Sequence, residues 1–254
     1  MDLLEIFSRP ESWAAVATLT LLEIVLGIDN IVFIAIITAR LPRALQPKAR
    51  RTGLAMALGS RLLLLLTLAW VVRLDRPLIS IAGFALSGKG IILLGGGLFL
   101  IAKSTLEIYR KTEMREEEET AGGTAAAFGS VVAQIALLDV IFSLDSVITA
   151  VGMVKELPLM VTAVLIAMGV MMVFADGVSE FINRHPSLKI LALAFLMLIG
   201  VLLIAEGTGH EFDRAYVYFA MVFSLLVELV NVRYRANVKR HALSAGERLG
   251  DHPL

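Results

Sequence analysis

The residues Leu21–Val32 read LLEIVLGIDNIV, an apolar run that contains two acids, Glu23 and Asp29. The pattern returns 116 residues later as LLDVIFSLDSVI, at Leu137–Ile148, with an acid in each of the same two places. Apolar blocks of about 20 residues are typical of transmembrane helices, and acids inside them usually face a cavity or a partner. The repeated stretch therefore indicates both the fold class and the place to look for function.

The composition agrees with a membrane protein. The 254 residues are 57% hydrophobic, whereas a soluble domain is about 45–50% apolar, and the mean hydropathy is +0.80. The excess comes in long blocks and not in alternating strands, which argues against an outer-membrane barrel. With no cysteine, the chain can form neither disulfides nor thiolate metal sites. The net charge is zero, and we expect a lipid bilayer around the chain and no nucleic-acid partner.

We expect an all-α, polytopic membrane protein with seven transmembrane helices. The segment Tyr109–Ala125 contains EMREEEET and GG, which predict a flexible, solvated linker. The segment Pro77–Lys89 is too short to span a bilayer, and we expect it at the membrane interface. The expected spans are Trp13–Thr38, Gly53–Val72, Gly90–Glu107, Ala126–Met153, Leu159–Ile182, Leu188–Ala205 and Tyr216–Arg233.

Charges at the chain start and in the loops predict the orientation. Asp2, Glu5 and Arg9 do not form the basic start of a cleaved signal peptide, so we expect the first span to remain. The loops after the first, third and fifth spans, together with the C-terminal tail, hold 16 of the 23 Lys and Arg residues. Because cytoplasmic loops are rich in Lys and Arg, we predict an inner-membrane protein with its N-terminus outside and its C-terminus cytoplasmic.

The alignment of the two acidic stretches predicts an internal duplication. Leu41 and Pro42 recur at the same offset as Leu157 and Pro158, and LIAK at Leu100–Lys103 is echoed by LIAE near the end of the sixth span. Two units of three spans each must enter the membrane in opposite directions, which is the inverted repeat of many secondary transporters. We predict a single membrane domain (1–254) with a first repeat (12–108), a linker (109–125), a second repeat (126–207), a seventh helix (213–234) and a cytoplasmic tail (235–254).

The acids and their neighbours predict a site for a hard cation. Asn30, Ser143 and Ser146 add oxygen donors to the carboxylates, and such donors suit Mn²⁺, Mg²⁺ or Ca²⁺. The alternative is charge pairing, for example with Arg61 in the second span, but one arginine cannot neutralise four carboxylates. The histidines lie near span ends or in the tail, which gives little support to a Zn²⁺ or Cu²⁺ site.

The spacing of the acids predicts an interrupted helix. Six residues rotate about 240° around an α-helix, so Glu23 and Asp29 do not share a face of an ideal helix. Gly27 and Ser143 lie between the acids of each copy, and we predict a break or kink there that frees carbonyl oxygens to line a cavity. A straight helix with its acids on two faces is the alternative.

Several stretches together resemble the TerC family of integral membrane proteins: LLEIVLGIDNIVF, LLDVIFSLDSVITAVG, ILLGGGLFLIAKSTLEI, RHPSLKILALAFLMLIG and YVYFAMVFSLLVELVN. The resemblance covers about residues 12–232 and is to members that consist of the transport domain alone. The family is named for tellurium resistance, some members are implicated in Mn²⁺ efflux, and it is grouped with LysE-like exporters built from three-plus-three inverted repeats. The sequence departs from it at Ser87–Ile91, SGKGI, where relatives often carry Arg-Asp.

The resemblance implies a metal-binding set, made of Glu23, Asp29, Asn30, Asp139, Asp145 and Ser146. Arg61, Glu228 and Asn231 are further candidates. Arg61 is expected to pair with a site carboxylate when no metal is bound, and Glu228 and Asn231 share a helix face. Asp176 is interpreted as a solvated carboxylate near a helix end.

These expectations combine into a secondary transporter that exports a divalent cation, with Mn²⁺ first and Mg²⁺ or Ca²⁺ as alternatives. No Walker-type GxxxxGK[ST] motif is present, so protons are the expected counter-ion. We expect no enzymatic activity and no covalently bound cofactor, and the sequence indicates no oligomeric state. Two other functions stay open: a membrane partner protein that supports insertion or metalation of other proteins around a structural ion, and a Ca²⁺ or proton pathway.

Overall fold

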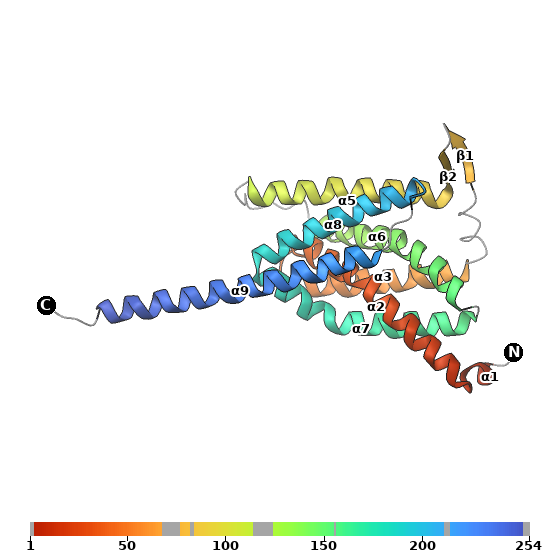
Figure 1. Ribbon diagram of the computed structural model, residues 1–254, viewed down its shortest axis with the longest axis horizontal. Coiled ribbons are helices and arrows are strands. Elements are labelled where there is room, and N and C mark those ends of the chain that lie inside the picture. The colour runs from red at the N-terminus through yellow and green to blue at the C-terminus, as the bar shows by residue number, and fades with distance from the viewer. Residues whose placement is uncertain are drawn as a thin grey trace.

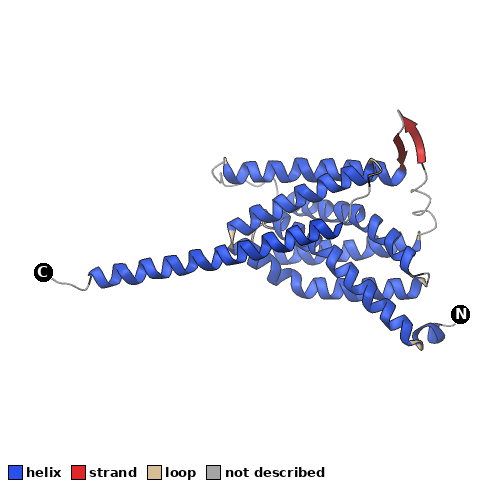
Figure 2. Ribbon diagram, viewed as in Figure 1, coloured by secondary structure: helices blue, strands red, loops and turns tan. Residues whose placement is uncertain are grey.

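The computed structural model is a bundle of long helices with one small β-hairpin (Figure 1; Figure 2). It describes residues 3–67, 77–81, 84–113, 124–154, 156–210 and 214–250, and the side chains of Asp29 and Asp145 are among those outside this description. The elements are α1 (Leu3–Phe7), α2 (Pro10–Thr38), α3 (Gln46–Leu66), β1 (Pro77–Ile81), β2 (Phe84–Ser87), α5 (Gly88–Thr112), α6 (Thr124–Met153), α7 (Leu157–Arg184), α8 (Pro186–Gly207) and α9 (Arg214–Gly250).

Local sequence signals set the ends of these helices. A proline occupies the first or second position of α2, α3, α7 and α8, where its missing N–H has no helical partner to lose. Ser87 caps α5, because its hydroxyl accepts a hydrogen bond from the Gly90 backbone N–H at 2.9 Å. After α8 the chain turns at Gly209, whose φ of +84° is easily adopted only by glycine.

Six described helices are long and apolar enough to cross a membrane, namely α2, α5, α6, α7, α8 and the Ala215–Arg235 part of α9. The expected second span, Gly53–Val72, is the exception. Its helix α3 begins earlier, at Gln46. Every 18-residue stretch of α3 contains Arg50, Arg51 and Arg61, which is too many charged residues for a candidate span. Residues 68–72 of that expected span lie outside the described part of the chain. The fold is therefore an all-α, multi-pass bundle with six candidate spans.

The structure adds detail to three other segments that the sequence singled out. Part of the segment Pro77–Lys89 forms the antiparallel hairpin of β1 and β2, because β-branched and aromatic residues alternate there with small ones. Helix α5 continues to Thr112, into the expected linker, and residues 114–123 of that linker lie outside the description. Helix α9 continues through most of the expected tail to Gly250, because no proline interrupts it.

The helices pack mainly in pairs. Helix α5 packs on α8, α2 on α7 and α3 on α6, and smaller contacts join α3 to α7 and α2 to α6. Helix α9 has its main contact with α8, and its C-terminal part projects well beyond the rest of the molecule (Figure 1). The acidic stretches of α2 and α6 are thereby enclosed by α3 and α7.

Close backbone contact holds α5 against α8. A Cβ added at Gly97 would lie 2.5 Å from the Gly200 carbonyl oxygen, and one added at Gly200 would lie 2.9 Å from the Gly97 carbonyl oxygen. Gly90 and Gly207 meet in the same way, at 2.7 and 2.8 Å. Small residues let helices approach this closely in a membrane, where packing replaces the hydrophobic effect as the source of association.

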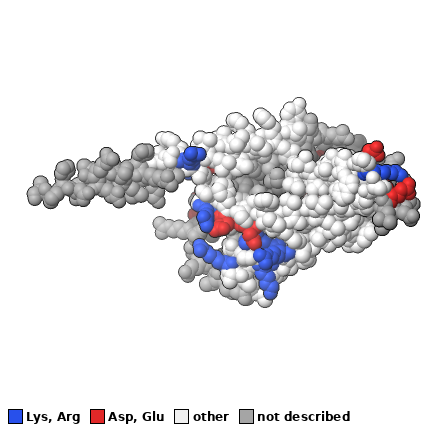
Figure 3. Space-filling model, turned by 90° about the horizontal axis from the view of Figure 1, so that it is seen from below, with Lys and Arg blue, Asp and Glu red and all other residues white. Residues whose placement is uncertain are grey.

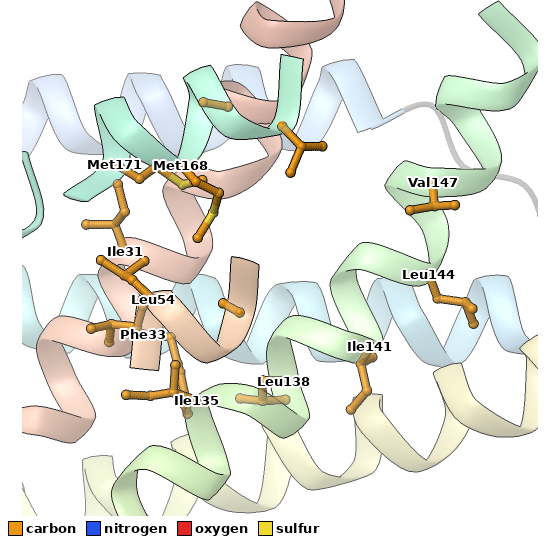
Figure 4. Close-up of a cluster of buried hydrophobic side chains, with 14 of the residues drawn as sticks. Ile31, Phe33, Leu54, Ile135, Leu138, Ile141, Leu144, Val147, Met168 and Met171 are labelled. Atoms are coloured by element: carbon orange, nitrogen blue, oxygen red, sulfur yellow. The ribbon is translucent and has the colours of Figure 1, made fainter. Parts of the chain in front are cut away.

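Most of the core is apolar, and many of the described exposed charged side chains lie near the ends of the bundle. Leu54 of α3 and Met168 and Met171 of α7 line one small cavity, and the buried side chains of α6 extend from it in a row (Figure 4). Figure 3 shows the described charged side chains of one face at the two ends of the bundle, with an uncharged belt between them. Such a belt is the surface that a bilayer core would cover.

Candidate functional site

A buried arginine joins the two acidic stretches. Arg61 of α3 is 3% exposed, and its Nη1 forms an ion pair with the Glu23 carboxylate of α2. Its Nη2 and Nε donate to Asp139 Oδ1 of α6 at 2.9 and 3.1 Å. Glu23 and Asp139 occupy equivalent places in the 116-residue repeat, so the guanidinium contacts one acid from each copy.

Neutral side chains surround the two carboxylates. Asn30 Nδ2 donates to Asp139 Oδ1 at 3.2 Å. The hydroxyls of Ser60 and Ser143 both donate to Asp139 Oδ2 at 3.1 Å. The buried Ser146 lies near Glu23, and its hydroxyl donates to the Ser143 backbone carbonyl oxygen at 3.3 Å. We call these seven residues the Arg61 cluster: Glu23, Asn30, Ser60, Arg61, Asp139, Ser143 and Ser146.

The Arg61 cluster places formal charge in the middle of the bundle. Glu23, Arg61 and Asp139 are each less than 5% exposed, and together they carry one net negative charge when ionised. Ionised groups removed from water are stabilised only by close partners and hydrogen bonds, and loss of one partner leaves the other uncompensated. The cluster therefore depends on all three charges.

Two small cavities lie at different depths beside this cluster. One is lined by Asn30, Ile34, Arg61, Ile135 and Asp139, among others, and the other by Leu19, Glu23, Val147 and Ala150, among others. Three pairs of lining positions are equivalent at the offset of 116 residues: Asp139 with Glu23, Ile135 with Leu19, and Ala150 with Ile34. Each cavity thus contains the first acid of one copy.

Of the predicted break or kink at Gly27 and Ser143, the break is not found, because α2 and α6 are each continuous α-helices through these positions. The small residues have other roles. A Cβ at Gly27 would lie 2.5 Å from Met171 Sδ, so glycine lets α2 approach α7. Ser143 is fully buried and hydrogen-bonds Asp139 one turn earlier on its own helix. The acids therefore reach the site from unbroken helices.

The other predicted site residues divide into two groups. Asp29 and Asp145 belong to α2 and α6, but their side chains lie outside the description. Among the described side chains, no three His, Cys, Asp or Glu residues gather closely enough to hold a metal ion. Asn231 donates to Glu228 at 3.3 Å on α9, a helix that packs mainly on α8, so this pair does not belong to the Arg61 cluster.

Ser60 and three ion pairs were not identified from the sequence. Ser60 belongs to the Arg61 cluster, and its only sequence signal is its place directly before the arginine. Asp176 is partly exposed, as interpreted, but it also pairs with the buried Arg50 at 2.7 Å and with Arg51 at 3.5 Å. Arg40, just after α2, pairs with the buried Glu107 of α5.

Comparison with known proteins identifies the family. The model of the integral membrane protein TerC family matches residues 8–243. A UPF0053 protein of Haemophilus influenzae is 48% identical over 92% of this chain and 99% of its own length. The UPF0053 inner membrane protein YgdQ of Escherichia coli K12 is 51% identical over 88% of this chain and 93% of its own length.

A third relative is longer. The UPF0053 inner membrane protein YoaE of Escherichia coli K12 is 46% identical over 94% of this chain, which spans only 46% of that protein. No solved structure matches. The match of nearly the whole chain to the family model, together with six candidate spans, shows that this chain belongs to the integral membrane protein TerC family and is a multi-pass protein of the bacterial inner membrane.

Proposed function

We propose that the protein is a secondary transporter that exports a divalent cation, Mn²⁺ first, through a carboxylate site between α2 and α6. The observation that carries this proposal is the pairing of both Glu23 and Asp139 with Arg61 deep in the bundle, although the two acids lie 116 residues apart in sequence. Acids at membrane depth indicate a functional site by default, because removing an ionised carboxylate from water costs more free energy than a purely structural role would usually recover.

The chemistry of the donors favours a hard cation. Glu23, Asp139, the side-chain carbonyl of Asn30 and the serine hydroxyls of the Arg61 cluster offer only oxygen ligands to a metal. Oxygen ligands suit Mn²⁺, Mg²⁺ and Ca²⁺, whereas Zn²⁺ and Cu²⁺ prefer imidazole or thiolate. Asp29 and Asp145 would add two carboxylates from the same two helices.

The packing of the helices supports an inverted repeat. Exchanging α2 with α6, α3 with α7 and α5 with α8 turns the α2–α7 contact into the α6–α3 contact, and it returns the α5–α8 contact to itself. Gly97 and Gly200, which touch, are 103 residues apart, the same offset as LIAK and LIAE. Transporters with such repeats bind their cargo near the midplane, where the two repeats meet.

Export of a divalent cation needs an energy source. Moving two positive charges outward against an inside-negative potential costs about 4.6 kcal/mol per 100 mV, twice the cost for one charge. We propose proton exchange, with carboxylates that bind metal and protons alternately, and an orientation with the N-terminus outside and the C-terminus in the cytoplasm.

The test is Mn²⁺ flux into proteoliposomes that contain a metal-sensitive dye, under an imposed pH gradient. Wild type is compared with Asp29→Asn and Asp145→Asn, and with Glu180→Gln, which changes an exposed carboxylate of α7 that pairs with Arg184 one turn away. We expect flux in wild type and in the Glu180 variant, and none in the two aspartate variants. Flux that survives both aspartate changes would contradict this site, and no wild-type flux under any gradient would contradict transport.

A further inference from the structure

Arg61 occupies the carboxylate oxygens that a cation would need. Its guanidinium takes both an oxygen of Glu23 and Oδ1 of Asp139, and its Nε also lies 3.4 Å from Asp139 Oδ2. Asn30 also donates to Oδ1 of Asp139, and the hydroxyls of Ser60 and Ser143 donate to its other oxygen, Oδ2. A metal ion bound to these two acids must therefore replace the arginine.

Among the four helices around the cluster, α2, α3, α6 and α7, Arg61 is the one Lys or Arg that lies within an apolar run. Helices α2 and α6 contain no Lys or Arg, and α7, which the proposed repeat pairs with α3, carries only Arg184 at its last position. The other basic residues of α3 are in its first two turns, where Arg50 pairs with Asp176. The two equivalent acids thus share a single cation that comes from only one repeat.

We propose that Arg61 is a tethered counter-cation that competes with the transported metal for Glu23 and Asp139. This inference rests on the proposed transport function. A guanidinium and a divalent cation repel each other strongly at a few ångströms in a poorly polarisable interior. The two cations therefore bind the acids in turn, and a small cavity lies directly beside the guanidinium, lined by Arg61, Asn30 and Asp139.

The competition affects two steps of the transport cycle, the release of the metal and the return of the empty carrier. Arg61 weakens metal binding, because the metal must displace it, and it thereby speeds metal release on the far side. It also compensates buried negative charge while the carrier returns without metal, a step in which uncompensated carboxylates would be costly. Exchange of metal for metal omits that return step, so it does not need the arginine.

The experiment separates binding, net export and exchange. Purified wild type, Arg61→Gln and the control Arg51→Gln, whose side chain is 76% exposed, are titrated with Mn²⁺ by calorimetry in detergent. The same proteins are then reconstituted for net Mn²⁺ efflux into metal-free buffer and for exchange of radioactive Mn²⁺ at equal concentrations on both sides. We expect Arg61→Gln to lower the Kd for Mn²⁺ by about tenfold or more, because a competing charge is lost. Net efflux should fall by a similar factor, because the carboxylates are no longer compensated while the carrier returns without metal.

Exchange by Arg61→Gln is expected to stay near the wild-type rate, and Arg51→Gln should match wild type in all three assays. An unchanged or higher Kd, or loss of exchange together with net efflux, would overturn the role of Arg61 while wild-type transport stands. If wild type itself neither binds nor moves Mn²⁺, the transport proposal fails and this inference fails with it.

A second variant covers the case in which Arg61→Gln does not fold. Arg61→Lys keeps the buried net charge, but a single ammonium cannot reproduce the forked contact of Nε and Nη2 with Asp139. It should therefore exclude the metal less well, and we expect Kd to fall by about threefold. A wild-type Kd in folded Arg61→Lys overturns the proposal.

Discussion

Arg61 and Asp139 join α3 to α6 in the middle of the bundle, with Nε and Nη2 of the guanidinium both within 3.1 Å of the same carboxylate oxygen. The second arm of the guanidinium reaches Glu23 on α2. One side chain thus links three helices, and its removal should destabilise the packing of all three.

We expect Arg61→Met to destabilise the fold by about 3–5 kcal/mol, because it leaves two buried carboxylates without their cation. Asp139→Asn should cost less, about 1–3 kcal/mol, because Arg61 keeps Glu23 and the amide still forms hydrogen bonds. Denaturant unfolding in detergent micelles measures both changes. Arg184→Gln, which breaks an exposed pair with Glu180, is the control and should cost less than about 1 kcal/mol. Equal losses for the first two variants would contradict a three-way charge cluster.

The α5–α8 contact predicts a difference between two neighbouring glycines. A methyl group at Gly97 would meet the backbone of Gly200 at 2.5 Å, whereas one at Gly95 would meet nothing within 4 Å. Gly97→Ala should therefore cost about 1–3 kcal/mol through overpacking. Gly95→Ala should stabilise the helix by up to about 1 kcal/mol. Thermal unfolding of the two purified variants tests this, and similar melting temperatures would count against the close approach of the helices.

Gly27 faces a flexible partner, and its substitution should behave differently from that of Gly97. The atom that a methyl group would meet is Met171 Sδ, at 2.5 Å, near the end of a side chain that can rotate away. We expect Gly27→Ala to cost less than about 1.5 kcal/mol in wild type. In a Met171→Ala background the cost should disappear, because the clashing atom is gone. The same cost in both backgrounds would instead indicate that Gly27 acts through the backbone of α2.

The predicted orientation can be tested by labelling, because the chain contains no cysteine. Ser8 precedes α2 and Arg43 follows it, and both are exposed. A membrane-impermeant maleimide applied to intact spheroplasts should label Ser8→Cys and not Arg43→Cys. Permeabilised cells should give equal labelling of the two variants. The reverse pattern in intact spheroplasts would invert the orientation.

Sequence patterns identified the long spanning helices within a few residues. The expected spans Trp13–Thr38 and Ala126–Met153 correspond to α2 (Pro10–Thr38) and α6 (Thr124–Met153). A run of apolar residues is a local property, and in a bilayer it leaves the backbone no alternative to a helix. The expected second span, Gly53–Val72, stays a prediction, because residues 68–72 lie outside the described part of the chain and α3 carries Arg50 and Arg51 before its apolar run and Arg61 within it. The segment of the β1–β2 hairpin was expected only to be too short to span, and its two strands are too short to carry a strong pattern of their own.

The partners of the acids depend on the tertiary structure. Sequence spacing suggested a broken helix at Gly27 and Ser143, because an ideal helix turns Glu23 and Asp29 to different faces. The structure keeps both helices intact and instead brings α3 between them, so that Arg61, 38 residues after Glu23 and 78 before Asp139, contacts both. Spacing along one helix carries no information about which side chain of another helix will face it.

By itself, the sequence determined that this protein is a polytopic helical membrane protein of the TerC family with acids repeated at membrane depth, because hydropathy, composition and motif are local properties of the chain. Only the tertiary structure decided that Arg61 joins Glu23 to Asp139, and that glycines set α5 against α8 and α2 against α7. These contacts follow from how helices distant in sequence pack, and packing depends on the shapes of two surfaces at once.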